Sequence, residues 1–233
     1  MTRGLHAAAA GMQVQLGRQD ILANNLANAS TVGYRRADLS VEQSFAEALG
    51  QAGALPGARA TTIDVSPGAV HETGDAFDLA IDGPGLFTLQ TDRGLRYTRD
   101  GRMRVAPDGR LLSASGHQVM GREGPIVLPG PEFLVSARGQ VFSEGQFVDG
   151  LFVAEFDGAD ALQRDTDGLL IAGRGPRMAE RPHVLQGYVE EANVSVVREM
   201  TEMMTGFRAF EASAAVLRQT DETLGTLIQS AGA

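Results

Sequence analysis

A helical apolar period occupies each end of this chain and is missing from the middle. In the first segment, about residues 2–28, apolar side chains recur at alternating spacings of three and four, the period of one helix face. Gln19 is the polar interruption of this stripe, and Gly33 follows as a natural helix stop. The stripe consists of Leu5, Ala9, Met12, Leu16, Ala23 and Leu26. The pattern predicts an amphipathic helix.

The second helical segment, about residues 194–230, is the longer one. Its apolar side chains repeat at spacings of four and three, close to a heptad, and Asp221 interrupts them. Asn193 or Ser195 can cap its start, and Glu199 lies near the positive end of the helix dipole. The stripe consists of Val196, Met200, Met203, Phe207, Phe210, Ala214, Leu217, Leu224 and Ile228. At 1.5 Å per residue this helix would be roughly 50 Å long.

The middle of the chain, residues 61–183, has the pattern of β structure. Glycine and proline punctuate short apolar runs such as residues 86–90 and 147–156. Asp100–Gly101 and Asp108–Gly109 are dipeptides typical of β-hairpin turns, because glycine accepts positive φ at little cost. The segment has no stable internal period, so a repeat array is not indicated. The segment therefore predicts one all-β domain of short strands, a sandwich or a barrel-like unit.

The predicted fold class is α+β, with four segments along the chain. Residues 1–36 contain the N-terminal helix, 37–60 a linker, 61–183 the central β domain, and 184–233 a strand or turn followed by the long helix. One interpretation is that each helix packs on its own domain. We favour a shared bundle of the two terminal helices, because neither has a neighbouring helix in sequence and isolated helices are marginal in water.

Composition argues against several classes of function. The formal charge of −9 and the pI near 4.9 disfavour a nucleic-acid-binding protein, which needs a basic face. The chain has no cysteine and no lysine, which removes thiol nucleophiles, thiolate metal ligands and Schiff-base lysines. The four histidines are scattered without metal-ligand spacing, and residues 165–168 lack the ligand positions of a calcium loop. We therefore expect no enzyme, no catalytic residues, no cofactor and no metal.

No stretch approaches the roughly 20 apolar residues that span a bilayer. The alanine-rich start resembles a signal peptide only briefly, because Gln13 and Gln15 break its apolar run. We expect a chain that is either cytoplasmic or exported without cleavage of an N-terminal signal.

Several segments resemble one known family. Residues 21–35, ILANNLANASTVGYR, closely resemble the N-terminal signature of the flagellar basal-body rod and hook family. Residues 185–194, LQGYVEEANV, together with 199–204 and 208–211, look like its C-terminal signature. Residues 80–87 and 97–101 resemble its central β domain. The resemblance covers nearly the whole chain, in the expected order.

The resemblance implies a fold, a function and a set of partners. In this family the terminal helices pair as an antiparallel coiled coil, these coils pack into an axial tube, and the β domain projects outward. The chain is then expected to be a structural subunit of the basal-body rod, which crosses the periplasm. Its implied partners are other rod subunits, further copies of itself, and the flagellar type III export apparatus, with no nucleic acid and no membrane insertion.

Chain length and three short segments indicate which type of rod or hook protein the chain resembles. Hook proteins generally carry additional outer domains, for which 233 residues leave little room. Residues 116–126, 200–204 and 220–222 are most similar to the proximal rod type, and the distal rod or hook type is the alternative. Tyr34 stands where these relatives often have phenylalanine.

The predicted assembly residues come from the two stripes and the two signatures. Asn24, Asn25 and Asn28 either satisfy backbone groups at a crowded subunit contact or form ordinary polar helix surface with a C-terminal cap. The full set is Leu5, Met12, Leu16, Asn24, Asn25, Leu26, Asn28, Gly33, Tyr34, Asn193, Val196, Met200, Met203, Phe207, Phe210, Leu217 and Leu224.

Two other classes of function stay open from the residues alone. An enzyme that hydrolyses a polymer would need two carboxyl groups about 5–10 Å apart in a cleft. A β-domain binding module with a helical dimerisation stalk would be a stable dimer with ordered ends.

Overall fold

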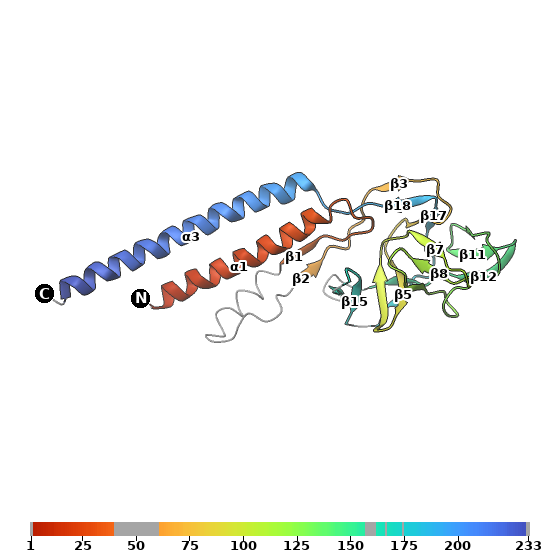
Figure 1. Ribbon diagram of the computed structural model, residues 1–233, viewed down its shortest axis with the longest axis horizontal. Coiled ribbons are helices and arrows are strands. Elements are labelled where there is room, and N and C mark those ends of the chain that lie inside the picture. The colour runs from red at the N-terminus through yellow and green to blue at the C-terminus, as the bar shows by residue number, and fades with distance from the viewer. Residues whose placement is uncertain (1, 40–60, 157–161, 166, 174, 232–233) are drawn as a thin grey trace. The chain divides into compact units, whose positions relative to one another are not determined.

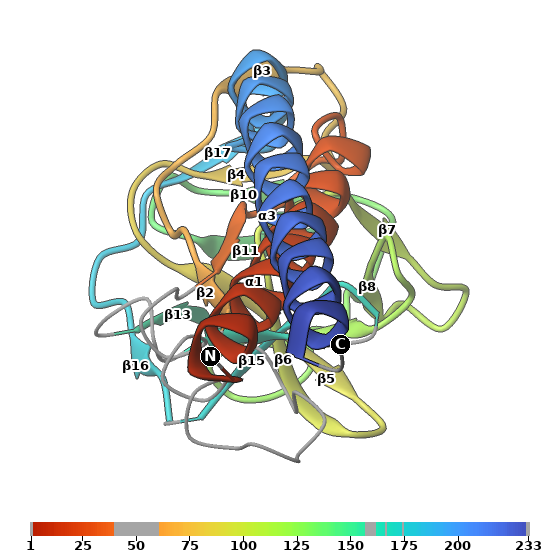
Figure 2. The ribbon, with the colours of Figure 1, turned by 90° about the vertical axis from the view of Figure 1, so that its left-hand side faces the viewer.

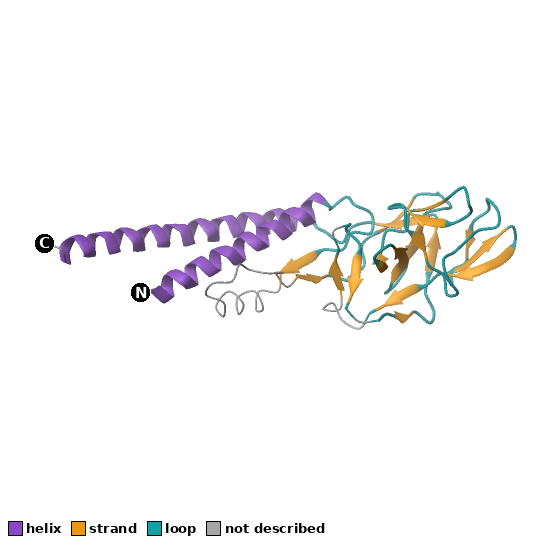
Figure 3. Ribbon diagram, turned by 60° about the horizontal axis from the view of Figure 1, so that its bottom comes forward, coloured by secondary structure: helices purple, strands orange, loops and turns teal. Residues whose placement is uncertain are grey.

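The computed structural model describes residues 2–39, 61–156, 162–165, 167–173 and 175–231. The chain divides into two compact units. The helix unit contains the described parts of 1–27, 37–61 and 195–233, and the β unit contains those of 28–36 and 62–194. Helices and many short strands together confirm the α+β class (Figure 3).

Two helices dominate the helix unit. Helix α1 spans Thr2–Ala27 and α3 spans Val196–Ala231, so α3 is longer by ten residues, 36 against 26. The helices lie side by side and run in opposite directions (Figures 1 and 2). The Ser195 carbonyl accepts the Glu199 N–H at 2.9 Å, so α3 begins directly after Ser195, one of the two residues predicted to cap it. Strand β1 (Ala37–Leu39) contacts α1 within the same unit.

The regular structure described in the β unit consists of strands of two to six residues. They are β2 (Thr61–Ile63), β3 (Val70–Glu72), β4 (Leu79–Ile81), β5 (Leu86–Thr91), β6 (Gly94–Thr98), β7 (Met103–Val105), β8 (Leu111–Ser113), β9 (Gln118–Val119), β10 (Leu134–Val135), β11 (Gln140–Ser143), β12 (Gln146–Gly150), β13 (Val153–Glu155), β14 (Leu162–Arg164), β15 (Leu170–Ala172), β16 (Arg177–Met178), β17 (Val184–Gln186) and β18 (Tyr188–Glu190).

The main sheet is antiparallel and is built around β5. Among the described residues its order is β14-β15-β6-β5-β9-β8-β7, with β13 paired to β5 and to β16. The first four side chains of β5 are buried, which suits a central strand covered on both faces. A smaller sheet has the order β10-β11-β12, and the pairs β17-β4 and β18-β3 complete the unit.

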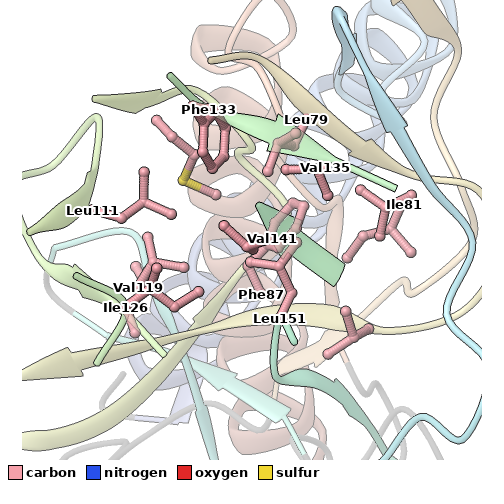
Figure 4. Close-up of a cluster of buried hydrophobic side chains, with 14 of the residues drawn as sticks. Leu79, Ile81, Phe87, Leu111, Val119, Ile126, Phe133, Val135, Val141 and Leu151 are labelled. Atoms are coloured by element: carbon pink, nitrogen blue, oxygen red, sulfur yellow. The ribbon is translucent and has the colours of Figure 1, made fainter. Parts of the chain in front are cut away.

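One hydrophobic cluster forms the core of the β unit (Figure 4). Leu79, Ile81 and Phe87 belong to this cluster, and Leu151 and Val184 join it from segments 64 to 105 residues later in the sequence. The predicted single β domain of short strands is consistent with this shared core.

The two predicted hairpin turns had different outcomes. Asp108–Gly109 joins the antiparallel strands β7 and β8, and Gly109 has φ of 82°, so this prediction is confirmed. The prediction at Asp100–Gly101 is wrong, because the strands on either side of it, β6 and β7, are not paired. Gly101 is required for another reason: a Cβ there would lie 1.6 Å from the Leu79 carbonyl oxygen.

The division into units differs from the predicted boundary at residue 184. Strands β17 and β18 pair with β4 and β3, so residues 184–194 belong with the β unit, and the helix unit resumes at Ser195. The predicted linker begins with β1 at residues 37–39, and its remaining residues, 40–60, lie outside the described part of the chain. None of the described helices is both long enough and apolar enough to cross a membrane.

Candidate assembly interface

The contact between α1 and α3 is formed by small and polar residues as well as apolar ones. On α1, Gly17, Leu22 and Asn25 are buried, and Leu22 is 2% exposed. On α3, Glu199 and Gly206 are buried. A Cβ at Gly206 would lie 3.1 Å from the Gln19 amide nitrogen, which shows how closely the helices approach at this level. Small residues at a helix contact permit such a close approach.

Polar contacts cross the helix pair in the described part of the chain. Arg18 and Glu202 form an ion pair at 3.3 Å, and the Gln19 amide donates to the Met203 carbonyl at 2.9 Å. The Asn25 amide donates to the Glu199 carboxylate at 3.0 Å. Asn25 and Glu199 are both fully buried, whereas the Arg18 side chain is 40% exposed.

A separate face of α3 carries apolar side chains that are exposed. This outer face consists of Val196, Val197, Met200, Met204 and Phe207, whose exposed fractions run from 41% to 76%. At 3.6 residues per turn these five positions fall within roughly 100° of the helix circumference. Contiguous apolar patches of this kind on a soluble protein mark interaction sites. The outer face is therefore the candidate interface of the helix unit.

The predicted apolar seam of α3 lies between the two faces. Met203 and Phe210 are half-buried, while Val196, Met200 and Phe207 belong to the outer face. The residues buried or half-buried towards the helix pair are Glu199, Glu202, Met203, Gly206, Phe210 and Ser213. Their mean direction is rotated by roughly 50° from that of the predicted seam, at 3.6 residues per turn. The seam residues remain predicted assembly residues, divided between an inner and an outer contact.

The predicted residues of α1 also differ in exposure. Met12 and Leu26 are half-buried, Leu16 is 49% exposed, and Asn24 is exposed beside the buried Asn25. The backbone positions of Leu5, Leu217 and Leu224 are helical, but their side chains lie outside the described part of the chain. Asn28 accepts the Thr31 hydroxyl at 3.2 Å, and its carbonyl accepts the Thr31 N–H, so it stabilises the turn after α1.

The second half of the N-terminal signature lies in the β unit. Gly33 has φ of 68°, and a Cβ there would lie 2.2 Å from the Asp100 nitrogen. The Gly33 N–H donates to the Glu190 carbonyl at 2.7 Å. Tyr34 is buried, and the Arg164 guanidinium lies over its ring at 4.2 Å from the centroid. The contacts of Gly33 and Tyr34 thus pack residues 28–36 against the rest of the β unit.

A buried ion cluster joins three segments of the β unit. The Glu190 carboxylate pairs with Arg35 at 2.7 Å and with Arg99, and it accepts the Gly68 N–H at 2.7 Å. Arg99 also donates to the carbonyls of Ile81, Gly83 and Gly85. Burial lowers the pKa of Arg99, and the Glu190 carboxylate opposes that shift. A charged group this deep is tolerated because it is paired and hydrogen-bonded.

Asn193, in the C-terminal signature, forms hydrogen bonds with the segments around Arg36 and Asp64. Its side-chain oxygen accepts the Arg36 N–H at 2.6 Å, and its amide donates to the carbonyls of Asp64 and Ser66. Burial would raise the pKa of Asp64, but hydrogen bonds from Ser66 and the charges of Arg36 and Arg35 outweigh it and lower that pKa. These contacts join two signatures that are far apart in the sequence.

Several of these residues were not found by sequence reasoning. Glu190, Arg35 and Arg99 were not among the predicted residues, because only tertiary structure reveals that they are buried together. All three lie inside segments that resembled the family, which was the one available signal. Across the described residues, no group of three or more His, Asp or Glu side chains is arranged to hold a metal ion.

Comparison with known proteins matches these segments to family domains. Residues 5–35 match "Flagella basal body rod protein", 80–143 match "Flagellar hook protein FlgE/F/G D1 domain", and 185–230 match "Flagellar basal body rod FlgEFG protein C-terminal". The flagellar basal-body rod protein FlgF of Mesorhizobium japonicum is 34% identical over 238 residues, covering 97% of this chain and 98% of that protein. The chain belongs to the flagellar basal-body rod protein family.

Other relatives place the chain within that family. FlgF of Salmonella typhimurium is 31% identical, with 97% of this chain and 96% of the relative covered. FlgG of Bacillus subtilis is 28% identical, with 98% of each covered. The chain is FlgF-like, with FlgG proteins also similar. The family is one of structural proteins, not of enzymes, so the chain is a structural subunit of the bacterial flagellar rod.

Proposed function

We propose that this rod subunit joins its neighbours through the outer face of α3, while α1 and α3 pair with each other as an antiparallel coiled coil. The observation that carries the proposal is the position of the apolar side chains. Val196, Met200 and Phe207 are 41% to 56% exposed, although they form a continuous stripe on a long helix. A stripe that the described residues leave exposed is a surface for another subunit.

The spacing of the inner residues supports a coiled coil. On α3, Glu199, Met203, Gly206 and Phe210 follow a 4-3-4 rhythm and are buried or half-buried. A heptad-like period keeps one face of a helix directed at its partner over several turns. The outer face has the same period, so a second row of helices can pack against it in a similar way.

The energetics of the outer face favour assembly. Burying one such side chain fully is worth about 1.5–3 kcal/mol relative to full exposure. Five side chains that are already partly covered would still contribute several kcal/mol per contact, before the entropy lost on association. If the contact is made with a different surface of the next subunit, and the rotation between subunits does not close into a ring, an open helical assembly results. That geometry is the one a rod requires.

The remaining expectations follow from the family and stay proposals. The chain is proposed to act at the proximal position, as its FlgF-like sequence suggests, with the distal position as the alternative. Its partners are other rod subunits and further copies of itself, and it is exported by the flagellar type III apparatus without a cleaved signal. The chain itself is proposed to catalyse no reaction, and the buried Glu190 cluster serves the fold.

A pair of matched substitutions tests the outer face. Phe207→Asp places a charge on the outer face, where Phe207 is 56% exposed, and Phe147→Asp makes the same change at an equally exposed phenylalanine, 57%, in the β unit. Each variant replaces the parent gene, and swimming, export and recovered basal bodies are measured. We expect Phe207→Asp to abolish motility while Phe147→Asp retains most of it. Normal motility of Phe207→Asp contradicts the proposal.

A further inference from the structure

We infer that the buried Asn25–Glu199 pair fixes the register of α1 against α3. The inference rests on the proposed function, because it concerns the helix pair that is proposed to carry assembly. It assigns two specificity-determining residues to that pair. Asn25 stands in the last turn of α1 and Glu199 in the first turn of α3.

Asn25 is held from two sides. Its side-chain oxygen accepts the Ala37 N–H at 3.0 Å and its amide donates to the Ala37 carbonyl at 2.8 Å, so the side chain binds the backbone of β1 much as a neighbouring strand would. The second amide hydrogen is directed to the Glu199 carboxylate, at 3.0 Å from nitrogen to oxygen. The orientation of Asn25 is therefore fixed by β1, and the amide hydrogen that faces α3 has a defined direction.

Glu199 supplies the acceptor for the Asn25 amide. Its side chain is 0% exposed, as is that of Asn25. A buried carboxylate without a hydrogen-bonded partner is costly, while a position in the first turn of a helix favours negative charge. The pair is thus acceptable in one arrangement and unfavourable in others, the behaviour by which a single buried asparagine selects register in coiled coils.

A slip of one turn illustrates the selection. In the observed register Asn25 lies opposite Glu199, so a slip of three or four residues towards the start of α3 would place it opposite Ser195 or Val196. The same slip would place Glu199 opposite Ile21 or Leu22 and leave the carboxylate without its amide donor.

The other polar contacts of the helix pair select register less well. Gln19 donates to a backbone carbonyl, and every turn of α3 presents a carbonyl. Arg18 and Glu202 are long side chains, 40% and 24% exposed, and can reach new partners after a slip. Only a side-chain partner at one position, buried at both ends, distinguishes one register from the next.

Engineered disulfides in the purified full-length chain report the register directly, because the chain has no cysteine of its own. Gln19→Cys with Gly206→Cys marks the observed register, since a Cβ at Gly206 lies beside Gln19. Met12→Cys with Gly206→Cys marks a slip of about two turns in one direction, and Ala23→Cys with Gly206→Cys marks a slip of about one turn in the other. Disulfide yields are compared at equilibrium in a glutathione buffer.

We expect the Gln19/Gly206 disulfide to exceed each slipped pair at least tenfold in the parent background. Glu199→Met, which keeps the length and helix propensity of the side chain, should reduce that ratio at least tenfold. Glu199→Gln, which can still accept from Asn25, should retain it, and so should Asn24→Leu at the exposed neighbouring asparagine. Asn25→Leu combined with Glu199→Leu should retain the helix pair but lose the selectivity.

The inference is overturned if Glu199→Met keeps the parent ratio, or if the parent chain forms the slipped disulfides as readily as the Gln19/Gly206 disulfide or forms none. The measurement needs no assembly. A chain with a fixed register whose outer face does not join subunits would refute the proposed function alone, and a functional rod subunit without register selectivity would refute this inference alone.

Discussion

The helix unit and the β unit place their apolar side chains in opposite ways. In the β unit Phe87, Leu89 and Leu151 are almost completely buried in one cluster. In the helix unit, Asn25 and Glu199 are buried between the helices while Met204 and Phe207 are more than half exposed. The β unit therefore has a core of its own, whereas the helix unit leaves apolar surface exposed on α3.

Both units bury charge, but with different consequences. Glu190 in the β unit is surrounded by two arginines and an N–H donor. Its contact with Arg35 joins residues 28–36 to strand β18. Glu199 in the helix unit has Asn25, a neutral partner on the other helix. We interpret the first as a rigid junction within a domain and the second as a device that chooses between arrangements.

The largest expected effect comes from the β-unit junction. Glu190→Ala leaves Arg35 and Arg99 buried without their carboxylate, which should lower the free energy of unfolding by about 3–5 kcal/mol. Urea unfolding followed by circular dichroism measures the change. Glu191→Ala, at the exposed neighbour, is the matched control and should stay within about 0.5 kcal/mol. Equal, small effects would show that the cluster does not stabilise the unit.

The next effect separates the two faces of α1. Leu22→Ala removes a side chain that is 2% exposed and should destabilise the helix pair by about 2–4 kcal/mol. Leu16→Ala removes the same atoms from a side chain that is 49% exposed, so its loss of stability should be well below that of Leu22→Ala. Hydrogen exchange of the α1 amides in the full-length chain is the measurement. A reversed order of the two variants would mean that α1 meets α3 through another face.

Glycine in the N-terminal signature gives a smaller and more local effect. Gly33→Ala combines positive φ with a clash against the backbone of Asp100, and should cost about 2–3 kcal/mol. Gly74→Ala has a similar φ of 75° and no atom within 4 Å of the added Cβ, so it should show the conformational cost alone, about 1 kcal/mol. Thermal unfolding compares them. If both variants lose the same stability, the close approach at Gly33 is unimportant.

The smallest effect is a dependence on pH that should appear in the β unit. Burial raises the pKa of the Tyr97 hydroxyl above 10.0, with Arg96 opposing the shift. A group whose pKa is raised by folding stabilises the protein fully below its unfolded pKa and loses that contribution as pH rises through the folded pKa. Unfolding measured from pH 8 to 11.5 should therefore show an alkaline loss that is weaker in Tyr97→Phe. An unchanged alkaline loss in that variant would contradict the assignment.

Sequence patterns predicted elements better than they predicted contacts. The period of α1 and α3 and the turn at Asp108–Gly109 are local properties, so they were readable from neighbouring residues. The prediction of a hairpin at Asp100–Gly101 was wrong, because the glycine at 101 is required by the close approach of the Leu79 carbonyl, 22 residues away in sequence. The face of α3 that meets α1 could not be chosen by hydrophobicity, because Glu199 and Gly206 lie there. Which charges are buried depends on the tertiary structure, and Glu190 and Arg99 gave no local sign of it.

The central claim is that the outer face of α3 contacts another rod subunit. It is tested most directly by placing the photo-crosslinking amino acid p-benzoylphenylalanine at position 207, where an aromatic ring is retained. Basal bodies isolated from motile cells are irradiated, and the products are identified by mass spectrometry. The account predicts an adduct between position 207 and another rod subunit in assembled basal bodies, and none in the purified, dilute chain. Assembled, motile cells in which position 207 yields no intermolecular adduct would contradict it.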